Sequence, residues 1–433
     1  MISIIKFRKI LNDLKRRPED AAKDLKISKK KIDKILSNKS KLDFQIIKKA
    51  VDIWPVNFGD FFSFVDDTIG DFKIMRATQS NSSQRIMSRG GNPYYLYKDT
   101  IMSKLSPFRP ELITELTIVK DNKPENRLVK FNNGHFLHQF TYFIGPVNFY
   151  YIKNNKKIVA QMNTGDSMYI SPYVPHSFTT RKNNQNELGK ILALTYTDKI
   201  DNETLNELSA LGYDIAKKYK LNLKNEKISF WSNLEKILKN SSLTLNEFKR
   251  KSLIDLSKLK KNKNIPNEKS LKKISKFLNI HVRDLLPPNN TIEVKIQKYQ
   301  ENKKWFYPSN KKKDYLFNEL TNIPQLPNSR GYEVTLKNDK KKTSFLEVPS
   351  HQYIYNLGKT KINFIIDNKI GYLNPQDSMY IKPNKKHCFY KKGKLLVLRL
   401  GGRISGDSLY QISMISDKNL KKTINDYKPW FNK

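Results

Sequence analysis

The chain has 433 residues and a formal net charge of +40, with 81 Lys and Arg residues against 41 Asp and Glu residues. Its length exceeds what one hydrophobic core normally serves, which predicts about two to four domains. The single cysteine, Cys388, excludes a disulfide framework and any thiolate metal site, and it predicts a reducing, cytoplasmic location. No stretch approaches the roughly 20 apolar residues of a membrane span, so we expect no membrane partner.

The positive charge is compatible with two kinds of partner, nucleic acid and a small anion. Lysines are spread along the whole chain, however, and Lys, Asn and Ile are frequent throughout it. We therefore interpret most of the charge as compositional, and nucleic acid is not expected as a partner. An anionic small substrate remains compatible with the charge.

Two helical regions are predicted, one at the start of each half of the chain. Residues 5–64 contain four short segments with apolar residues at i, i+3 and i+4 spacing and with Ser or Asp near their starts. Residues 229–286 repeat this pattern. Both regions have the layout of a helix-turn-helix bundle.

Each helical region is followed by a β-rich region. Residues 144–159 and 357–372 alternate apolar and polar residues around Asn-rich turns, as in a hairpin of an antiparallel sheet. The Pro-Pro-Asn-Asn run at 287–290 marks the joint before the second β-region. We therefore predict an α+β fold with four domains. They are a helical bundle over 1–65, a β-domain over 66–210, a second bundle over 211–290 and a second β-domain over 291–433.

The two halves are predicted to be duplicates. The segment TGDSMYISPYVPHSF at 164–178 matches PQDSMYIKPNKKHCF at 375–389, with an identical Asp-Ser-Met-Tyr-Ile run and a His ten residues after the Asp. Aligning the halves places His387 against His176, but it places Val348 against His135. The second β-domain is therefore predicted to bind no metal.

Three residues are candidates for a metal site in the first β-domain. His135 and Gln139 are four residues apart, so on one extended strand both side chains face the same way, whereas His138 faces away. His176 follows Pro175 in a later strand. Two imidazoles and one oxygen donor leave open positions on the metal, which favours an iron(II) oxygenase over a zinc site.

Together these features resemble a known family. The helix-turn-helix layout, NNGH at 132–135 and GDSMYISPYVPHS at 165–177 are similar to those of the cupin iron oxygenases that act on phosphonates. Its members are hydroxyethylphosphonate dioxygenase, hydroxypropylphosphonate epoxidase and methylphosphonate synthase. The resemblance implies a tandem repeat of helix-turn-helix bundle plus antiparallel β jelly-roll (cupin) barrel. It also implies Fe(II) as the cofactor, held by His135, Gln139 and His176.

Two positions separate the family members. The dioxygenase has a metal-binding Glu six residues before the second His, where this chain has Ile170. The epoxidase has Glu four residues after the first His, where this chain has Gln139. A Gln at the one position with an apolar residue at the other is the pattern of the synthase.

The resemblance further implies the residues that bind substrate, since guanidinium, amide and phenol groups match the oxygens of a phosphonate. The expected phosphonate ligands are Lys15, Arg89, Tyr95, Tyr97, Asn132 and Arg399. Lys15 and Tyr97 are also the expected catalytic residues. Arg16 and Arg17 are close enough to Lys15 to leave open which of the three reaches the substrate, and Arg399 stands where the dioxygenase has Lys.

The expected reaction is the cleavage of the C–C bond of 2-hydroxyethylphosphonate by O2, which gives methylphosphonate and CO2. Two alternatives remain open. The first is the dioxygenase reaction, which gives hydroxymethylphosphonate and formate. The second is a transcription regulator with a helix-turn-helix head and a ligand-sensing cupin, although the lysines of SKKKIDKILSN suit phosphates more than bases. The oligomeric state is also open, and a homo-oligomer is compatible with the sequence.

Overall fold

A computed structural model describes residues 2–184, 187–197, 200–223, 225–262, 264–286, 292–339, 343–404 and 406–425. The chain divides into two compact units. The first comprises Met1–Lys73, Met102–Ser106 and Gly402–Lys433, and the second comprises Ile74–Ile101 and Pro107–Gly401. The predicted joint at 287–290 lies outside the described residues. Among the described helices, none combines the length and apolar character that crossing a membrane requires.

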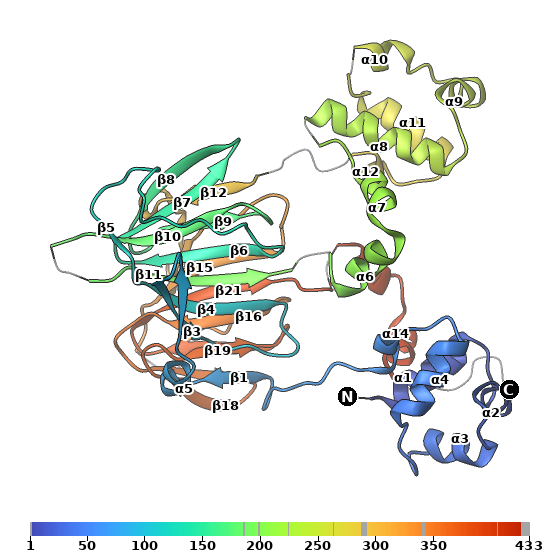
Figure 1. The fold of residues 1–433 in the computed structure, drawn as a ribbon, viewed down its shortest axis with the longest axis horizontal. Helices are drawn as coiled ribbons and strands as arrows, with labels where there is room; N and C mark the ends of the chain where they lie inside the picture. The colour runs from blue at the N-terminus through green and yellow to red at the C-terminus, as the bar shows by residue number, and fades with distance from the viewer. Residues whose placement is uncertain are drawn as a thin grey trace. The chain divides into compact units, whose positions relative to one another are not determined.

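Short helices make up most of the first unit (Figure 1). They are α1 (Ile4–Asp13), α2 (Pro18–Leu25), α3 (Lys29–Leu36), α4 (Phe44–Ile53), α13 (Asp407–Ser413) and α14 (Asp417–Asn425), with a 3-10 turn η1 (Phe58–Phe61). Ser3, Ser28 and Asp43 accept hydrogen bonds from backbone N–H groups at the starts of α1, α3 and α4, as helix-capping residues do. Phe7 and Trp54 belong to the apolar core of this unit.

The first β-region of the second unit, which we call the first β-lobe, follows the short helix α5 (Ala77–Ser82). Its strands are β2 (Arg85–Arg89), β3 (Asn92–Asp99), β4 (Phe108–Glu115), β5 (Ile118–Val119), β6 (His138–Ile144), β7 (Val147–Lys153), β8 (Lys156–Met162), β9 (Ser167–Ile170), β10 (His176–Arg181) and β11 (Lys190–Tyr196). The pairs are antiparallel, except for a two-residue parallel contact between β5 and β10.

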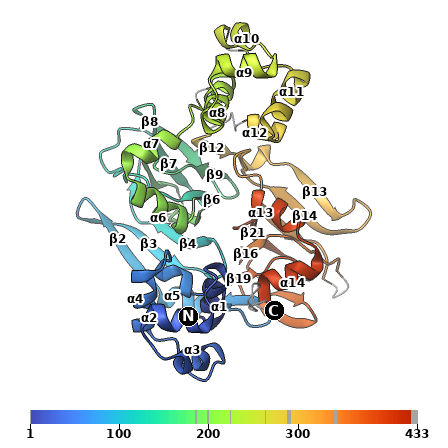
Figure 2. The same cartoon turned by 90° about the vertical axis from the view of Figure 1, so that its right-hand side faces the viewer.

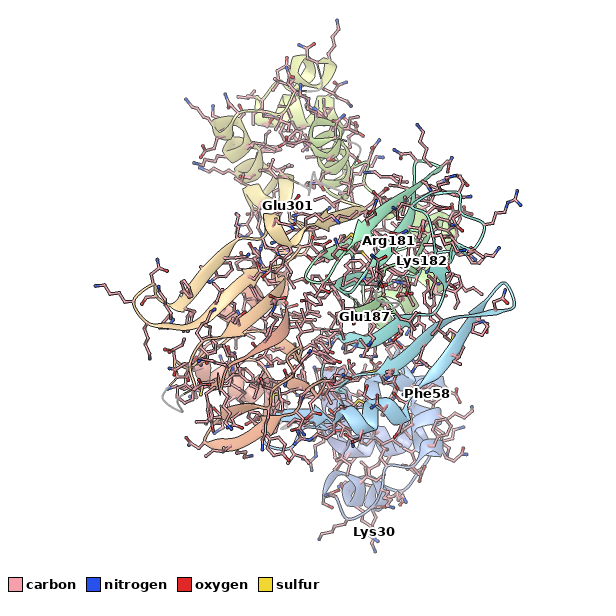
Figure 3. The ribbon with its side chains drawn as sticks, turned by 90° about the vertical axis from the view of Figure 1, so that its left-hand side faces the viewer. Lys30, Phe58, Arg181, Lys182, Glu187 and Glu301 are labelled. Atoms are coloured by element: carbon pink, nitrogen blue, oxygen red, sulfur yellow. The ribbon has the colours of Figure 1, made fainter. Side chains whose placement is uncertain are left out.

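Two sheets form the first β-lobe. One has the order β12-β9-β6-β11-β4-β3-β2, where β12 (Val294–Gln297) comes from the second half of the chain, and the other has the order β5-β10-β7-β8. Tyr95, Phe143 and Ile170 belong to the apolar core of the lobe. Arg181, at the end of β10 (Figure 3), donates to the Asn163 side chain at 2.6 Å and so fixes the end of the smaller sheet.

A group of helices follows the first β-lobe (Figure 1). They are α6 (Asn202–Leu211), α7 (Tyr213–Tyr219), α8 (Glu226–Asn240), α9 (Leu245–Ser252), α10 (Ser257–Lys261), α11 (Glu268–Leu278) and α12 (Val282–Leu285). Trp231, Phe248 and Ile274 are part of an apolar core that α8, α9 and α11 share. Helices therefore occupy the second region where the apolar spacing predicts them.

The second β-lobe lies beside the first (Figures 1 and 2). After the turn η2 (Tyr299–Glu301), its strands are β13 (Lys304–Pro308), β14 (Lys313–Glu319), β15 (Ser329–Leu336), β16 (His351–Asn356), β17 (Ile362–Ile366), β18 (Lys369–Leu373), β19 (Ser378–Ile381), β20 (His387–Tyr390) and β21 (Gly393–Leu400). They form the sheets β1-β19-β16-β21-β15-β14-β13, which includes β1 (Phe72–Met75), and β18-β17-β20. The predicted mixture of helices and antiparallel sheet is confirmed.

The repeated Asp-Ser pair joins the two β-lobes. Asp166 accepts hydrogen bonds from Lys298 Nζ at 3.0 Å and from the backbone N–H of Tyr299 at 2.9 Å. In the equivalent contact of the second motif, Asp377 accepts a hydrogen bond from Arg76 Nη1 at 2.7 Å. It accepts another from the backbone N–H of Ala77 at 2.8 Å. Both carboxylates are buried, where charged hydrogen bonds are strong.

The serines complete this arrangement, which we call the reciprocal clasp. Ser167 Oγ accepts from the backbone N–H of Thr321 at 2.9 Å, and Ser378 Oγ accepts from that of Ile101 at 2.8 Å. Each copy of the repeated motif thus binds a segment from the other half of the chain. Both copies of the motif therefore make equivalent contacts between the two β-lobes.

Candidate metal centre

The first β-lobe encloses a cavity of about 100 Å³. All three predicted metal ligands and four of the six predicted phosphonate ligands line it. The lining residues are Arg89, Tyr95, Tyr97, Glu111, Ile113, Asn132, His135, Gln139, His176, Phe178, Ala193 and Thr195. They come from both sheets of the lobe and from the loop before β6.

The three candidate metal ligands face one another in this cavity. Nε2 of His135 lies 3.0 Å from Oε1 of Gln139. The rings of His135 and His176 have centroids 5.3 Å apart and planes 85° apart. The prediction that His135 and Gln139 share a strand is wrong, because β6 begins at His138 and His135 lies in the loop before it.

Gly134 explains why this loop replaces the start of a strand. Its φ of +75° lies in the left-handed region, which strands do not adopt and which glycine tolerates. A Cβ at this position would lie 2.5 Å from the backbone of Tyr173. The backbone N–H of Tyr173 also donates to His135 O at 2.8 Å. The close approach of the two backbones therefore holds His135 in the cavity.

The hydrogen bonds of the two imidazoles fit metal ligation. Nδ1 of His135 lies 2.8 Å from Leu137 O, and Nδ1 of His176 lies 2.8 Å from Val174 O. Since a carbonyl oxygen only accepts, each Nδ1 carries a proton, and Nε2 is the ring nitrogen left to face the cavity. Backbone partners of this kind orient histidine ligands in metalloproteins.

The amide of Gln139 is also held in the orientation of a ligand. Its Nε2 donates to Thr141 Oγ1 at 2.8 Å, which turns Oε1 toward the lone pair of His135 Nε2. Two acceptors that face each other at this distance need a cation or a further proton between them. Within the described part of the chain, no three His, Cys, Asp or Glu side chains form a metal cluster. The amide oxygen of Gln139 thus remains the candidate for the third donor, beside the two imidazoles.

Burial keeps His176 uncharged and separates His138 from the site. Burial lowers the pKa of His176 to about 3, and the neutral imidazole is the form that binds metals. His138 stacks on Tyr169, and its Nδ1 lies 2.7 Å from the Tyr169 hydroxyl. Burial also lowers the pKa of His138, to about 4. His138 faces away from the cavity, as the strand alternation predicts.

Arg89 and Asn132 lie beside the candidate ligands. The guanidinium of Arg89 is 4.7 Å from the centre of the Tyr95 ring and donates to Lys130 O at 2.6 Å. Asn132 Nδ2 lies 3.1 Å from His176 Nε2, and Asn132 Oδ1 accepts from the backbone N–H of His176 at 2.8 Å. Asn132 Oδ1 therefore holds the backbone of His176, while its Nδ2 faces the same Nε2 atom that a metal would take.

The two remaining predicted phosphonate ligands do not line this cavity. Lys15 lies in the first unit, directly after α1, and its role stays a prediction. Arg399 lies on β21 and lines a separate cavity in the second β-lobe, where its Nε donates to Gln352 Oε1 at 3.3 Å. The structure therefore places Arg399 apart from the other candidates, because β21 belongs to the sheet of the second lobe.

Two acidic residues near the site do not figure in the sequence-based predictions. Glu111 lines the cavity and pairs with Arg85, and burial raises the pKa of Glu111. Glu115 is fully buried four residues later. A signal for both exists in the strand FRPELITE, where Glu111, Ile113 and Glu115 share one face and two of the three are acids.

Comparisons with known proteins decide the family. No protein-family model matches the chain. The methylphosphonate synthase of Nitrosopumilus maritimus is 44% identical over 435 residues, which cover 98% of this chain and 94% of that protein. This chain belongs to the methylphosphonate synthase family. The predicted resemblance to the phosphonate oxygenases is thereby confirmed.

Two further relatives of this methylphosphonate synthase family member support the family assignment. The structure of Streptomyces albus HEPD, a hydroxyethylphosphonate dioxygenase with 2-hydroxyethylphosphonate and Fe(II) bound, matches with a TM-score of 0.92 and 30% identity over 99% of this chain and 98% of that one. The (S)-2-hydroxypropylphosphonic acid epoxidase of Streptomyces wedmorensis is 29% identical over 90 residues, which are 21% of this chain and 43% of that protein.

The second β-lobe of this family member has a closed counterpart of the site. In the β16–β21 pair, Gln352 lies opposite Arg399, as Gln139 lies opposite Thr195 in the β6–β11 pair. His387 begins β20 as His176 begins β10. The cavity there measures about 10 Å³. The guanidinium of Arg399 thus occupies the space that the first lobe leaves open.

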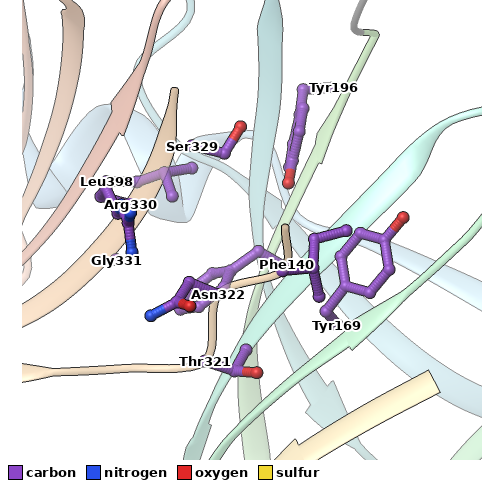
Figure 4. A pocket seen from close by; sticks show the side chains of 10 residues that line it. Phe140, Tyr169, Tyr196, Thr321, Asn322, Ser329, Arg330, Gly331 and Leu398 are labelled. Carbon is purple, nitrogen blue, oxygen red and sulfur yellow. The ribbon is translucent and has the colours of Figure 1, made fainter. Parts of the chain in front are cut away.

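A second small cavity lies between the β-lobes (Figure 4). Phe140, Tyr169 and Tyr196 of the first lobe and Arg330 of the second are among its lining residues. Its volume of about 10 Å³ is too small for a phosphonate and corresponds to roughly one water molecule. The cavity around His135, Gln139 and His176 therefore remains the candidate site.

Proposed function

We propose that this chain is an iron(II)-dependent oxygenase that cleaves the C–C bond of 2-hydroxyethylphosphonate with O2 to give methylphosphonate and CO2. The substrate and one O2 contain the atoms of methylphosphonate, CO2 and one water, so no further reductant is required. The observation that carries this proposal is the third candidate ligand, which is the amide of Gln139 where a carboxylate is usual.

The register of β6 and β9 supports this choice of reaction. Gln139 and Ile170 are direct partners across these strands, so both side chains point to the same face of the sheet. A carboxylate at either position would reach the same metal. In the family resemblance, Glu at the position of Ile170 marks the dioxygenase, and Glu at that of Gln139 marks the epoxidase. This chain has neither, which supports the synthase.

Different residues in the cavity bind the proposed iron and the substrate. Iron(II) held by His135, Gln139 and His176 supplies the activation of O2. Arg89 binds the phosphonate through its planar guanidinium, which matches two phosphonate oxygens. Burial raises the pKa of Tyr97 to about 12, so its phenol keeps its proton and donates a hydrogen bond to the substrate.

Apolar side chains complete the pocket. Ile113, Phe178 and Ala193 line the cavity next to the candidate ligands. They exclude water from the reacting carbon atoms, which protects a reactive intermediate from side reactions. Asn132 holds His176 in place, and we retain Lys15 as the residue of the first helical bundle that contacts the substrate.

We also propose the finer features of the fold. Each β-lobe is a cupin barrel, each helical region is a helix-turn-helix bundle, and the four domains cover residues 1–65, 66–210, 211–290 and 291–433. The second barrel binds no metal, because Arg399 fills its cavity. The single cysteine supports a cytoplasmic location.

One alternative has a specific observation in its favour. The match to Streptomyces albus HEPD covers 99% of this chain at 30% identity, which keeps the dioxygenase reaction as the second candidate. The transcription regulator has less support, because the likeness to the Nitrosopumilus maritimus synthase extends over 98% of the chain and includes both helical regions.

Phosphorus NMR of the products tests the proposal. The purified full-length protein is incubated with Fe(II), O2 and 2-hydroxyethylphosphonate, and we expect methylphosphonate as the phosphorus product. Hydroxymethylphosphonate together with formate would instead assign the dioxygenase reaction. Unchanged substrate with the iron-loaded protein would overturn both.

A further inference from the structure

Glu115, at the end of β4, is fully buried in the first β-lobe. Neither of its carboxyl oxygens has a hydrogen-bond partner among the described residues. Glu115 lies on the same face of β4 as Glu111 and Ile113, which line the candidate site. A buried carboxyl without a partner destabilises a folded protein by several times the thermal energy. Its presence beside a binding cavity therefore points to a function.

Arg89 is the charged group that acts on Glu115. Tyr95 is the direct partner of Glu115 across β3 and β4, and the guanidinium of Arg89 lies 4.7 Å from the centre of the Tyr95 ring. Burial raises the pKa of Glu115 well above its usual value, and the positive charge of Arg89 opposes this effect. In the described part of the chain, Arg89 donates to Lys130 O, His176 O and Ser177 Oγ and forms no ion pair.

The other groups around Glu115 carry no charge or are paired. Tyr94, Tyr95 and Tyr97 on β3 keep their protons, since burial raises the pKa of each phenol. Glu111, on the same strand, pairs with Arg85. The contacts of Glu115 with Thr180 on β10 and with Gly189 involve only its backbone atoms. Among the described residues, Arg89 is therefore the charged group that opposes the effect of burial on this carboxyl.

The second β-lobe lacks both members of this pair. Leu336 lies opposite Tyr315 as Glu115 lies opposite Tyr95. The equivalence is secure because the Tyr315 hydroxyl accepts from the backbone N–H of Phe389, just as that of Tyr95 accepts from β10. Strand β13, the counterpart of β2, contains no arginine. The acid and the arginine thus occur only in the lobe that holds the candidate metal ligands.

We propose that Glu115 takes up one proton when a phosphonate binds to Arg89. The inference rests on the proposed function, which assigns Arg89 to the phosphonate. A bound phosphonate neutralises Arg89 and adds negative charge to a region of low dielectric, and both changes disfavour a carboxylate nearby. The proton comes from solvent and adds to the carboxylate, and no other bond forms or breaks.

Glu115 is therefore a positioning residue that acts through Arg89. Above the pKa of Glu115 in the free protein, its carboxylate shares the charge of Arg89, and in the complex its neutral carboxyl leaves that charge to the substrate. By linkage, phosphonate affinity falls by up to about tenfold per pH unit above the pKa of Glu115 in the free protein, and it is insensitive to this group below that pKa.

Titration calorimetry tests the inference. The full-length protein is loaded with Fe(II), and 2-hydroxyethylphosphonate is added without O2 in two buffers that differ in heat of ionisation. The difference in heat reports the protons taken up on binding. The measurement is repeated from mildly acidic to mildly alkaline pH with the parent protein, Glu115→Gln and the matched control Glu111→Gln. Protonation of the phosphonate itself contributes equally to all three.

We expect the parent protein and Glu111→Gln to take up more protons than Glu115→Gln at alkaline pH, with the difference approaching one proton. The affinity of Glu115→Gln should fall less steeply with pH. Equal proton uptake in Glu115→Gln and the parent overturns the inference but leaves the proposed function standing. An absence of phosphonate binding in every variant overturns both. If Glu115→Gln does not fold, Glu115→Leu is used instead, because leucine is the residue at the equivalent position of the second lobe. The same outcomes then decide the test.

Discussion

The two β-lobes share the same strand pairing around Gln139 and Gln352, but the first has a far larger cavity there than the second. The first holds His135, Gln139 and His176 around a cavity of about 100 Å³. The second keeps Gln352 and His387, yet its cavity is reduced to about 10 Å³. The presence of a glutamine and a histidine at these two positions therefore does not by itself identify a metal site. The deciding difference is whether space and charge at the third position suit a cation.

Arg399 provides that difference. Its guanidinium lies over the rings of Phe317 and Tyr332, at 5.6 and 5.1 Å, and donates to Gln352. A fixed cation in this position satisfies the amide oxygen that would otherwise face a metal. Burial lowers the pKa of Arg399, and burial also lowers that of His387, to about 4. In the second lobe, a guanidinium therefore lies beside the glutamine that corresponds to Gln139.

The largest expected effect separates the two equivalent histidines. His176→Ala should abolish iron binding and turnover, because it removes one of the three proposed protein ligands. His387→Ala should leave both nearly unchanged. Metal analysis and phosphorus NMR of the products measure the two effects, and the parent protein should hold about one iron. Two irons per parent chain, or an inactive His387→Ala protein that is folded, would contradict the comparison.

The next effect concerns the two equivalent glutamines. Gln139→Ala should lower iron affinity, because water replaces an oriented amide oxygen, whereas Gln352→Ala should not. Gln139→Glu should bind iron more tightly, since a carboxylate adds negative charge at the same length. Iron titration and product analysis distinguish these variants. A Gln139→Ala protein with the iron affinity and products of its parent would show that the amide is no ligand.

A smaller effect is expected at the phosphonate. Arg89→Lys should weaken substrate binding by about 1–3 kcal/mol, because lysine cannot form two parallel hydrogen bonds to a phosphonate. Tyr97→Phe should weaken it less. Calorimetry with 2-hydroxyethylphosphonate measures both, and Arg399→Lys serves as the control in the other lobe. If Arg399→Lys weakens binding as much as Arg89→Lys does, the assignment of Arg399 to the closed lobe is wrong.

A double variant tests whether a metal site can be created in the second β-lobe. Val348→His combined with Arg399→Thr restores the missing imidazole and removes the guanidinium, and Thr is the residue that lies opposite Gln139 in the first lobe. We expect iron content to rise above that of the parent, with weaker binding at the new site. Arg399→Thr alone should not raise it. Unchanged iron content in the folded double variant would show that more than these two residues closes the lobe.

The smallest effect concerns the reciprocal clasp. Asp166→Asn and Asp377→Asn should each lower the free energy of unfolding by about 1–2 kcal/mol, because each weakens a buried charged hydrogen bond. Urea denaturation measures the change. Since the contacts are mirrored, the two losses should be similar in size. A loss confined to one of them would show that the two halves of the clasp are not equivalent.

Much of the site could be predicted from the sequence. The repeat and the opposite orientations of Gln139 and His138 follow from local patterns, because alternation along a strand decides which side chains share a face. The expectation for Tyr97 comes from the family resemblance. The position of His135 could not be derived in this way. It depends on the left-handed φ of Gly134 and on the packing of its loop against Tyr173, which lies far along the chain.

Long-range pairing limits prediction elsewhere too. The role of Asp166 and Asp377 is invisible in the repeat itself, since their partners lie more than a hundred residues away. Arg399 could be recognised as a basic residue of the second β-domain, but which cavity it enters depends on the sheet to which β21 belongs. Glu115 shows no local sign of burial without a partner, because that depends on every strand around it.

Strand β12 has a consequence for how the chain can be shortened. Residues Val294–Gln297 pair with β9 and end the larger sheet of the first lobe. A half-length chain that stops before β12 would expose β9, with the buried residues Met168 and Ile170, as an unprotected edge strand. Such edges recruit strands from other molecules. By covering β9, strand β12 from the second half of the chain therefore protects the first β-lobe from aggregation. We expect the isolated first half to precipitate during expression.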